Sequence, residues 1–311
     1  MLDLDVLDRR VADAMRAFVH DNALPESSPY LLASLPPDDV DAFVSVVVRV
    51  WRCPDSVAED LLQSSLNILK ILCRKDCNRF QFGVRAIGAV VAAMSNSTSM
   101  EVLAACANVL MNACHNRSCV DHLVALNGVP GIVQLLECKH AGVVCAAAGV
   151  LRSVACERTG RQAILQTRAI PLLVPLLSAP QEGPIPRVCA RAIATLHNLT
   201  CDHQAIGQLR ACSDALRLIA VLLQSPHDIR LRASAAGVVQ NIALDEECRR
   251  ELQGLAVVEH LSALALGTDV DAQAHAIGAL WNMSGASKSS DRFKSILADC
   301  LVAGALLDDS Q

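Results

Sequence analysis

The stretch AIGALWNMS, residues 276–284, places an asparagine, Asn282, directly after the bulky Trp281 in an otherwise apolar helical run. Three earlier segments have an asparagine in the same setting: NVLMNAC at Asn112, ATLHNLT at Asn198 and GVVQNIA at Asn241. Two others keep the pattern with a different residue: NILKILC at Lys70 and GVLRSVA at Ser153. We call this place the signature position. It recurs at residues 70, 112, 153, 198, 241 and 282, in steps of 42, 41, 45, 43 and 41 residues, so the chain contains an internal repeat.

A second pattern precedes several of these helices. Its clearest copies are NGVPGIVQLL (127–136) and TRAIPLLVPLL (167–177), and its weaker copies are CSDALRLIAVLL (212–223) and LAVVEHLSALAL (255–266). A short segment that starts with polar residues comes before each copy. Glycine and proline separate the segments, because neither residue readily continues a helix. Each repeat is therefore predicted to hold a short first helix, a second helix and a longer third helix.

A period of about 40 to 47 residues with three helices per unit is the range of armadillo and HEAT repeats. The pattern G-V/I-P-x-V/L-V-x-L-L followed by A-x-G-A/V-L-x-N resembles the armadillo family, in a form closer to β-catenin than to importin-α. The resemblance covers roughly residues 38–307. It implies an all-α fold, an armadillo-type right-handed superhelix (solenoid) of about six three-helix repeats with a groove on one side.

The repeat pattern also sets the expected domain boundaries. Residues 1–37 are expected to form an N-terminal leader or cap, residues 287–307 a partial C-terminal cap and residues 308–311 an acidic tail. The six repeats are predicted at 38–75, 76–115, 116–156, 157–201, 202–245 and 246–286, the first of them with only its last two helices. Their third helices are predicted at 57–73, 100–114, 143–156, 186–200, 229–244 and 270–284.

The composition narrows the choice of partner and compartment. Hydrophobic residues make up 52% of the chain and aromatic residues 3%, so few side chains are available to stack on unpaired bases. A formal charge of −5 gives no general attraction to nucleic acid or to anionic membranes. We expect neither a nucleic-acid partner nor membrane insertion. Fourteen cysteines without a secretory signal favour a reducing compartment, so the expected location is cytoplasmic, with nuclear or ciliary locations left open.

Motifs for catalysis or cofactor binding are missing from the sequence. There is no G-x-x-x-x-G-K-S/T, G-x-G-x-x-G, G-x-S-x-G or H-E-x-x-H. Several cysteines lie close together, but no pair of C-x-x-C motifs has zinc spacing. Cys106, Cys145 and Cys189 fall inside repeat helices, where a small apolar residue is needed. We expect no enzyme activity, no catalytic residues, no metal and no cofactor.

One face of each third helix is more polar than the rest. At about 100° per residue, the positions 4, 7 and 11 before the signature position share its side of the helix. We call this side, together with the residue just before the signature position, the signature face. The residues seven before are Gln63, Ala105, Ala146, Arg191, Ser234 and His275, and those eleven before are Glu59, Glu101, Gly142, Arg187, Arg230 and Asp271.

In armadillo proteins the third helices line the groove, and the signature asparagine binds the backbone of an extended peptide. An amide suits this role because it both donates and accepts hydrogen bonds. The resemblance gives this role to Asn112, Asn198, Asn241 and Asn282, whereas Lys70 and Ser153 interrupt the row. A second explanation stays open, in which each asparagine caps its helix or bonds to a neighbouring turn.

Cations gather on the middle repeats: Arg152, Arg187, Arg191, His197 and Arg230, with Lys70 farther away. Guanidinium groups favour a partner segment with Asp, Glu or phosphate, although solvated surface arginines would give the same pattern. The candidate partner-binding residues are Lys70, Asn112, Arg152, Ser153, Arg187, Arg191, His197, Asn198, Arg230, Ser234, Asn241, His275, Trp281 and Asn282.

The sequence therefore predicts a non-enzymatic scaffold or adaptor that binds an extended, acidic or phosphorylated segment of another protein in its groove. Importin-α carries a tryptophan four residues before each groove asparagine, but Asn108, Ala194, Gly237 and Gly278 stand there, which argues against a nuclear-transport receptor. An assembly component of a cytoskeletal or ciliary structure and a regulatory subunit of an enzyme complex remain alternatives. The sequence gives no prediction of oligomeric state.

Overall fold

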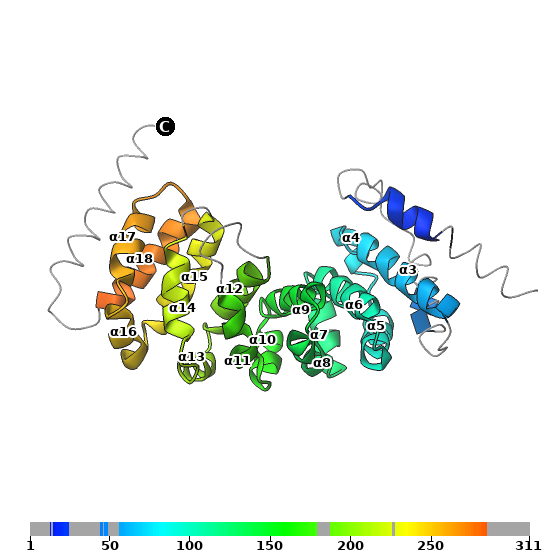
Figure 1. The fold of residues 1–311 in the computed structure, drawn as a ribbon, viewed down its shortest axis with the longest axis horizontal. Coiled ribbons are helices and arrows are strands. Elements are labelled where there is room, and N and C mark those ends of the chain that lie inside the picture. The colour runs from blue at the N-terminus through cyan, green and yellow to red at the C-terminus, as the bar shows by residue number, and fades with distance from the viewer. Residues whose placement is uncertain are drawn as a thin grey trace, which may run out of the picture. The chain divides into compact units, whose positions relative to one another are not determined.

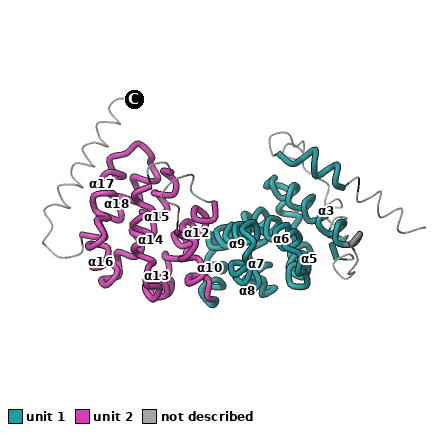
Figure 2. Tube along the Cα trace, viewed as in Figure 1, with its two compact units in different colours: residues 1–167 teal, residues 168–311 magenta. Residues whose placement is uncertain are grey.

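The computed structural model describes residues 13, 15–24, 44–45, 47–48, 56–178, 187–225 and 228–284. Every regular element within these ranges is a helix (Figure 1), so the predicted all-α class is confirmed. The chain divides into two compact units, Met1–Thr167 and Arg168–Gln311 (Figure 2). The expected cap at 287–307, the tail at 308–311 and most of the expected leader lie outside the described residues.

Unit 1 is built around three long helices that lie side by side, each the third helix of a repeat. They are α3 (Ser56–Leu72), α6 (Met100–Ala113) and α9 (Ala141–Val154). The helices between and after them are α4 (Asp76–Arg79), α5 (Val84–Asn96), α7 (Arg117–Ala125), α8 (Val129–Gln134) with the 3₁₀ turn η3 (Leu135–Glu137), and α10 (Arg158–Leu165). Helix α6 contacts both α3 and α9, so the repeats stack through their third helices.

Unit 2 repeats this arrangement. Its third helices are α12 (Arg187–Leu199), α15 (Ile229–Ile242) and α18 (Val270–Ser284), and α15 contacts both of the others. The remaining helices are α11 (Ala169–Leu173) with the 3₁₀ turn η4 (Val174–Leu177), α13 (His203–Arg210), α14 (Ala215–Leu223), α16 (Glu246–Gln253) and α17 (Val257–Ala265). All six third helices begin and end within two residues of the positions that the repeat pattern predicts.

Small aliphatic side chains form the core of the stack. In unit 1, Ala105, Cys106 and Ala107 on α6 and Ala146 and Ala147 on α9 are all 5% exposed or less. Such short side chains let neighbouring helix backbones approach closely, and stacking buries an apolar surface that a single repeat would leave in water. The low aromatic content of the sequence is therefore a property of the packing.

First helices begin at a polar cap four residues after the signature position. The side chains of Asn116, Asp202 and Asp245 each accept a hydrogen bond of 2.9 Å from a backbone N–H in the first turn, of Ser118, Gln204 and Cys248 respectively. These caps satisfy N–H groups that have no partner inside the helix. They fix the sharp turn between one repeat and the next.

An arginine in the first helix binds the end of the preceding third helix in three repeats. The bonds are Arg79 Nε to Cys73 O at 2.8 Å, Arg161 Nη1 to Ala155 O at 3.0 Å and Arg249 Nη1 to Ala243 O at 3.1 Å. A guanidinium suits this place because the last carbonyls of a helix lack backbone donors and carry partial negative charge. The sequence analysis missed these arginines.

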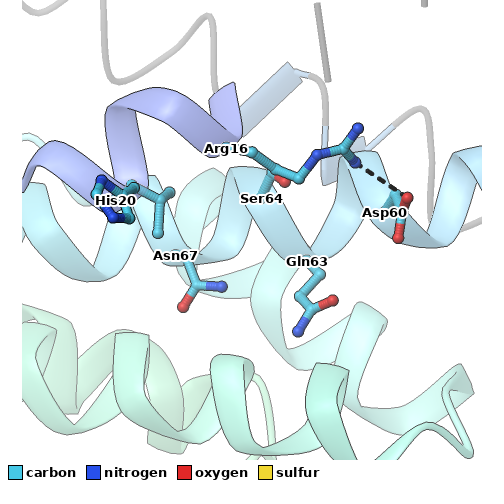
Figure 3. A pocket seen from close by; sticks show the side chains of 7 residues that line it. Arg16, His20, Asp60, Gln63, Ser64 and Asn67 are labelled. Carbon is cyan, nitrogen blue, oxygen red and sulfur yellow. Dashed lines mark hydrogen bonds and ion pairs between the residues drawn. The ribbon is translucent and has the colours of Figure 1, made fainter. Parts of the chain in front are cut away.

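The helical segment at residues 15–21 lies against α3, the first third helix among the described residues. Arg16 Nη1 is 3.0 Å from Asp60 Oδ2, and Arg74 donates to the backbone oxygens of Asn22 at 2.9 Å and Ala23 at 3.0 Å. A polar cavity of about 340 Å³ lies between the segment and α3 (Figure 3). The cavity is lined by Arg16, Val19, His20, Asp60, Gln63, Ser64 and Asn67.

Within the described ranges, no single helix has both the length and the apolar character of a membrane span. The helices Arg117–Ala125 and Val129–Glu137 have that length and apolar character only when they are taken together, and the chain bends by 92° between them.

Two glycines in first helices allow a matched test of the packing. A Cβ at Gly160 on α10 would be 2.1 Å from the carbonyl oxygen of Val154, whereas a Cβ at Gly207 on α13 would meet nothing within 4 Å. We expect Gly160→Ala to lower the free energy of unfolding by about 1–3 kcal/mol, as overpacking does. Gly207→Ala should raise it by about 0.5–1 kcal/mol, because alanine restricts the unfolded chain and favours helix. Urea denaturation midpoints measure both, and a shift of the same sign in both variants would contradict this packing.

Candidate functional site

Three of the four signature asparagines, Asn112, Asn241 and Asn282, connect consecutive third helices. In each pair the side-chain amide nitrogen donates to a backbone carbonyl near the end of the preceding third helix. The bonds are Asn112 Nδ2 to Lys70 O at 3.1 Å, Asn241 Nδ2 to His197 O at 3.2 Å and Asn282 Nδ2 to Gln240 O at 2.8 Å. This geometry matches the second explanation drawn from the sequence, a bond to a neighbouring turn.

The accepting carbonyl is one that the backbone leaves without a partner. At the end of α3 the N–H of Arg74 bonds to Ile71 O, and at the end of α15 the N–H of Leu244 bonds to Asn241 O. The chain therefore leaves each helix by a tighter turn, which skips the carbonyl of Lys70 or Gln240. A buried carbonyl without a donor costs free energy, so the next repeat supplies the donor.

Ser153 makes the same contact with a hydroxyl. Its Oγ lies 3.2 Å from Met111 O on α6, the carbonyl skipped at the end of that helix, and 3.3 Å from Gly149 O in its own helix. The residue is 5% exposed. Ser153 therefore continues the row that it was expected to interrupt, and burial leaves no surface with which it could contact a partner as predicted.

The bonds between repeats leave part of the asparagine side chains available to a partner. Asn112, Asn198, Asn241 and Asn282 are all partly exposed. The Oδ1 atoms of Asn112, Asn241 and Asn282 accept no hydrogen bond from any described residue, while their nitrogens point to the preceding helix. Unit 1 thus offers one such acceptor, on Asn112, and unit 2 offers two, on Asn241 and Asn282, which suit N–H donors.

Glycines four residues before the signature position admit side chains from the preceding repeat. A Cβ at Gly237 on α15 would be 2.4 Å from His197 Nε2, and a Cβ at Gly278 on α18 would be 2.3 Å from Gln240 Nε2. The side chain just before the signature position therefore lies on the backbone of the next third helix. A tryptophan cannot fit at these places, which explains its absence there.

Two histidines from different repeats meet on the signature face of unit 2. The rings of His197 on α12 and His275 on α18 have centroids 4.6 Å apart and lie nearly perpendicular, at 87°. His275 Nδ1 is 3.0 Å from Gln240 Oε1. Burial, and then the neighbouring His275, lower the pKa of His197 to about 4. His197 is therefore neutral at pH 7.

The charged residues of the signature face differ between the units. In unit 2, Arg187 and Arg230 are exposed at equivalent places on α12 and α15, and neither forms an ion pair with a described acidic residue. Arg191 and Ser234 are partly exposed on the same helices. Asp271 occupies the equivalent place on α18. Unit 2 therefore presents the unpaired guanidinium groups of Arg187 on α12 and Arg230 on α15. It also presents the imidazoles of His197 on α12 and His275 on α18.

Unit 1 has a mixed face. Glu59 and Glu101 are exposed eleven residues before the signature position, while Arg152 is exposed just before it. Burial, and then the charge of Arg74, lower the pKa of Lys70. The predicted cationic region is thus divided, with Lys70 and Arg152 on unit 1 and the other cations on unit 2.

His115 lies three residues after the signature position of the second repeat. Burial, followed by the charges of Arg79 and Arg152, lowers its pKa.

Trp281 is a partner-binding candidate from the sequence. Its side chain is 68% exposed, which is more than expected for a side chain beside a groove. It occupies the place of His197 and Gln240, but no described helix follows α18 to cover it.

The described cysteines are free thiols. Burial raises the pKa of Cys119 and of Cys189 to about 11, and burial with the charge of Asp245 raises the pKa of Cys248 to about 12. Such thiols stay protonated near neutral pH and are poor nucleophiles. No three described His, Cys, Asp or Glu side chains converge on a point where a metal ion could sit.

Comparisons with known proteins find a matching repeat family and distant relatives. The profile of the family described as Armadillo/beta-catenin-like repeat matches residues 116–155. Vacuolar protein 8 of Yarrowia lipolytica is 25% identical over 178 residues, which are 55% of this chain and 29% of that protein. Vacuolar protein 8 of Schizosaccharomyces pombe is 21% identical over 201 residues, 64% of this chain and 36% of that protein. The chain thus spans about a third of the length of these relatives.

Solved structures match over more of the chain. An engineered protein superposes with a TM-score of 0.71 at 23% identity, covering 94% of this chain and 67% of its own. A designed armadillo repeat protein in complex with the peptide (KR)4 has a TM-score of 0.64 at 20% identity and covers 78% of this chain and 99% of its own. These structures share the fold of this chain.

The bond between repeats can be tested at Asn241. Asn241→Asp removes the N–H donor and places a carboxylate oxygen against His197 O, so we expect the free energy of unfolding to fall by about 1–3 kcal/mol at pH 7. The control is Asn96→Asp, because Asn96 is exposed and bonds within its own helix to Ala92 O at 2.7 Å. Its change should stay within about 0.5 kcal/mol. Thermal unfolding followed by circular dichroism distinguishes the two; equal losses would remove the inter-repeat role of Asn241.

The burial of His197 predicts a pH dependence of stability. Its pKa falls from 6.5 to about 4 on folding, so below pH 6.5 the unfolded chain binds the proton that the folded chain excludes. Stability is full above pH 6.5 and falls by up to about 3 kcal/mol as the pH approaches 4. His197→Gln should flatten the slope of the unfolding free energy between pH 6.5 and 4, while His203→Gln on α13 should leave it unchanged. Urea denaturation at several pH values gives both slopes, and parallel curves for wild type and His197→Gln would refute the assignment.

Proposed function

We propose that this chain, which has the fold of armadillo repeat proteins and matches their repeat at residues 116–155, is a non-enzymatic scaffold or adaptor that binds an extended segment of a partner protein. The segment would lie along the signature face of the third helices. The observation that carries this proposal is the row of signature amides, whose nitrogens bond to the preceding repeat and whose Oδ1 atoms accept no bond from the described chain.

Acceptors on consecutive repeats, such as Asn241 and Asn282 of unit 2, suit the main chain of an extended segment, whose N–H groups recur at regular intervals whatever its side chains. The inter-repeat bonds also hold each amide in one orientation before a partner arrives. Preorganised groups lose less entropy on binding, so this arrangement supports recognition of the backbone. Side-chain preference must then come from other positions on the same face.

The charges of unit 2 favour an acidic or phosphorylated segment. Arg187 and Arg230 are exposed on neighbouring helices without ion pairs to described acids, and His197 and His275 lie on the same face. Each guanidinium group of this chain can form two parallel hydrogen bonds to a carboxylate or phosphate of the partner. A basic segment has no such acceptor groups and would be repelled by the same arginines. The basic peptide (KR)4, which the designed armadillo protein binds, is therefore the contrasting probe for this chain.

The proposal is tested with acetylated, amidated deca-glutamate carrying a fluorescent label. Arg187→Glu with Arg230→Glu should weaken its binding about tenfold or more, because two attractive contacts become repulsive. The control is Arg217→Glu with Arg250→Glu, which makes the same charge change at arginines paired with Asp214 and Glu246 within or beside their own helices. Fluorescence anisotropy gives both affinities, and (KR)4 should not bind.

Equal weakening in the two double variants would show that net charge alone attracts the peptide and would defeat the proposed face. Tighter binding of (KR)4 than of deca-glutamate would reverse the predicted partner chemistry. Affinity capture from cell extract with the same pair of variants, read by mass spectrometry, then identifies natural partners that depend on Arg187 and Arg230.

A further inference from the structure

We propose that unit 2 binds an acidic segment together with protons, which the His197–His275 pair takes up, so that the protein holds its partner more tightly as the pH falls. This inference rests on the proposed function and adds a regulatory property to the same face. It starts from the contact between imidazoles of two repeats that are not neighbours in the stack.

The geometry of the pair depends on the helix between its members. His197 projects from α12 and His275 from α18, and both belong to helices that flank α15. Gly237 on α15 makes the meeting possible, because any Cβ there would be 2.4 Å from His197 Nε2. The two rings therefore lie together on the signature face, over the middle of three consecutive repeats.

The protonation sites of the pair follow from its hydrogen bonds. Gln240 Oε1 is an acceptor, so His275 Nδ1 carries a hydrogen and donates to it across 3.0 Å. The other ring nitrogen of His275, Nε2, is then the site that gains a proton. His197 makes no side-chain hydrogen bond to a described residue. A ligand oxygen could therefore accept a hydrogen bond from either ring without displacing an existing one.

The three third helices of unit 2 carry more cations than anions. Arg187 and Arg191 lie on α12, and Arg230 and Arg232 lie on α15. Asp271 is the acidic residue of α18, exposed one turn before His275. No described carboxylate forms an ion pair with either ring, and burial and His275 are the causes that lower the pKa of His197.

The elements packed on these helices do not change that balance. Helix α11 and turn η4 carry no charged residue, and the second helices α14 and α17 carry Arg217, Glu259 and His260. None of these contributes to the lowered pKa of His197. The pair therefore consists of two imidazoles that lack a counter-ion.

A carboxylate of a bound segment would supply that counter-ion. An opposite charge within about 4–6 Å raises the pKa of a histidine, so the rings would take up protons when the segment binds. Uptake of protons on binding means that the affinity increases as the pH falls, by up to about tenfold per pH unit for one proton. The arginines of the face do not titrate in this range, so the pH dependence belongs to the histidines.

Isothermal titration calorimetry with deca-glutamate tests the inference. Binding measured at pH 6.5 in PIPES and in Bis-Tris, which differ in their heat of ionisation, gives the number of protons taken up. For the wild type we expect about one proton per peptide and about tenfold tighter binding at pH 6.0 than at pH 7.5. His197→Gln with His275→Gln should abolish the uptake and flatten the pH dependence, whereas His203→Gln on α13 should retain both.

A second measurement does not depend on the stability of any variant. The histidine ring protons of the wild type, followed by NMR, should titrate at higher pH for His197 when the peptide is bound. Binding of deca-glutamate without proton uptake, or with uptake unchanged in the double variant, would overturn this inference and leave the proposed function in place. Absence of binding at both pH 6.0 and pH 7.5 would overturn both.

Discussion

The hydrogen bond from a signature side chain to an orphaned carbonyl of the preceding helix is the contact on which the repeat array depends. Helices α3, α6 and α15 end in a turn that skips one carbonyl, and the next repeat supplies the missing donor from Asn112, Ser153 or Asn282. At the end of α12, Asn241 and Thr200 both donate to His197 O. The bond requires the two helices to keep one register, because a shift of one residue would move the donor away from the skipped carbonyl. Structure and candidate function therefore share the same side chains: the nitrogens of Asn112, Asn241 and Asn282 bond to the preceding helix, and their oxygens accept no bond from the described residues.

The fold could be predicted because its signals repeat. An asparagine, serine or lysine at a fixed place, with glycine and proline between helices, recurs often enough that the period and the third helices follow from the sequence. Contacts that occur once carry no such signal. The histidines at 197 and 275 meet across an intervening repeat, and nothing periodic relates them. Arg79, Arg161 and Arg249 were equally hidden, because an arginine within a short polar helix has the same appearance in sequence as a solvated one.

Ser153 shows how an expectation drawn from a family can mislead. The resemblance assigned a peptide-binding amide to the signature position, and serine therefore counted as an interruption. The physical need at that place is a donor for Met111 O, which a hydroxyl meets as well as an amide. What differs is reach: the shorter side chain is buried and leaves no acceptor at the surface. The row is continuous for packing and interrupted for binding at the same residue.

The arginine in the first helix has a consequence for how the chain can be shortened. Arg161 lies on α10, which belongs by sequence to the fourth repeat, yet it bonds to Ala155 O and Cys156 O at the end of α9 in the third. Compact unit 1 accordingly extends through Thr167 and includes α10. The natural module therefore consists of a third helix followed by the first helix of the next repeat, offset by one helix from the sequence period. A truncation placed at the sequence boundary would strip the carbonyls of α9 of their donor, so fragments intended to fold alone should end after α10.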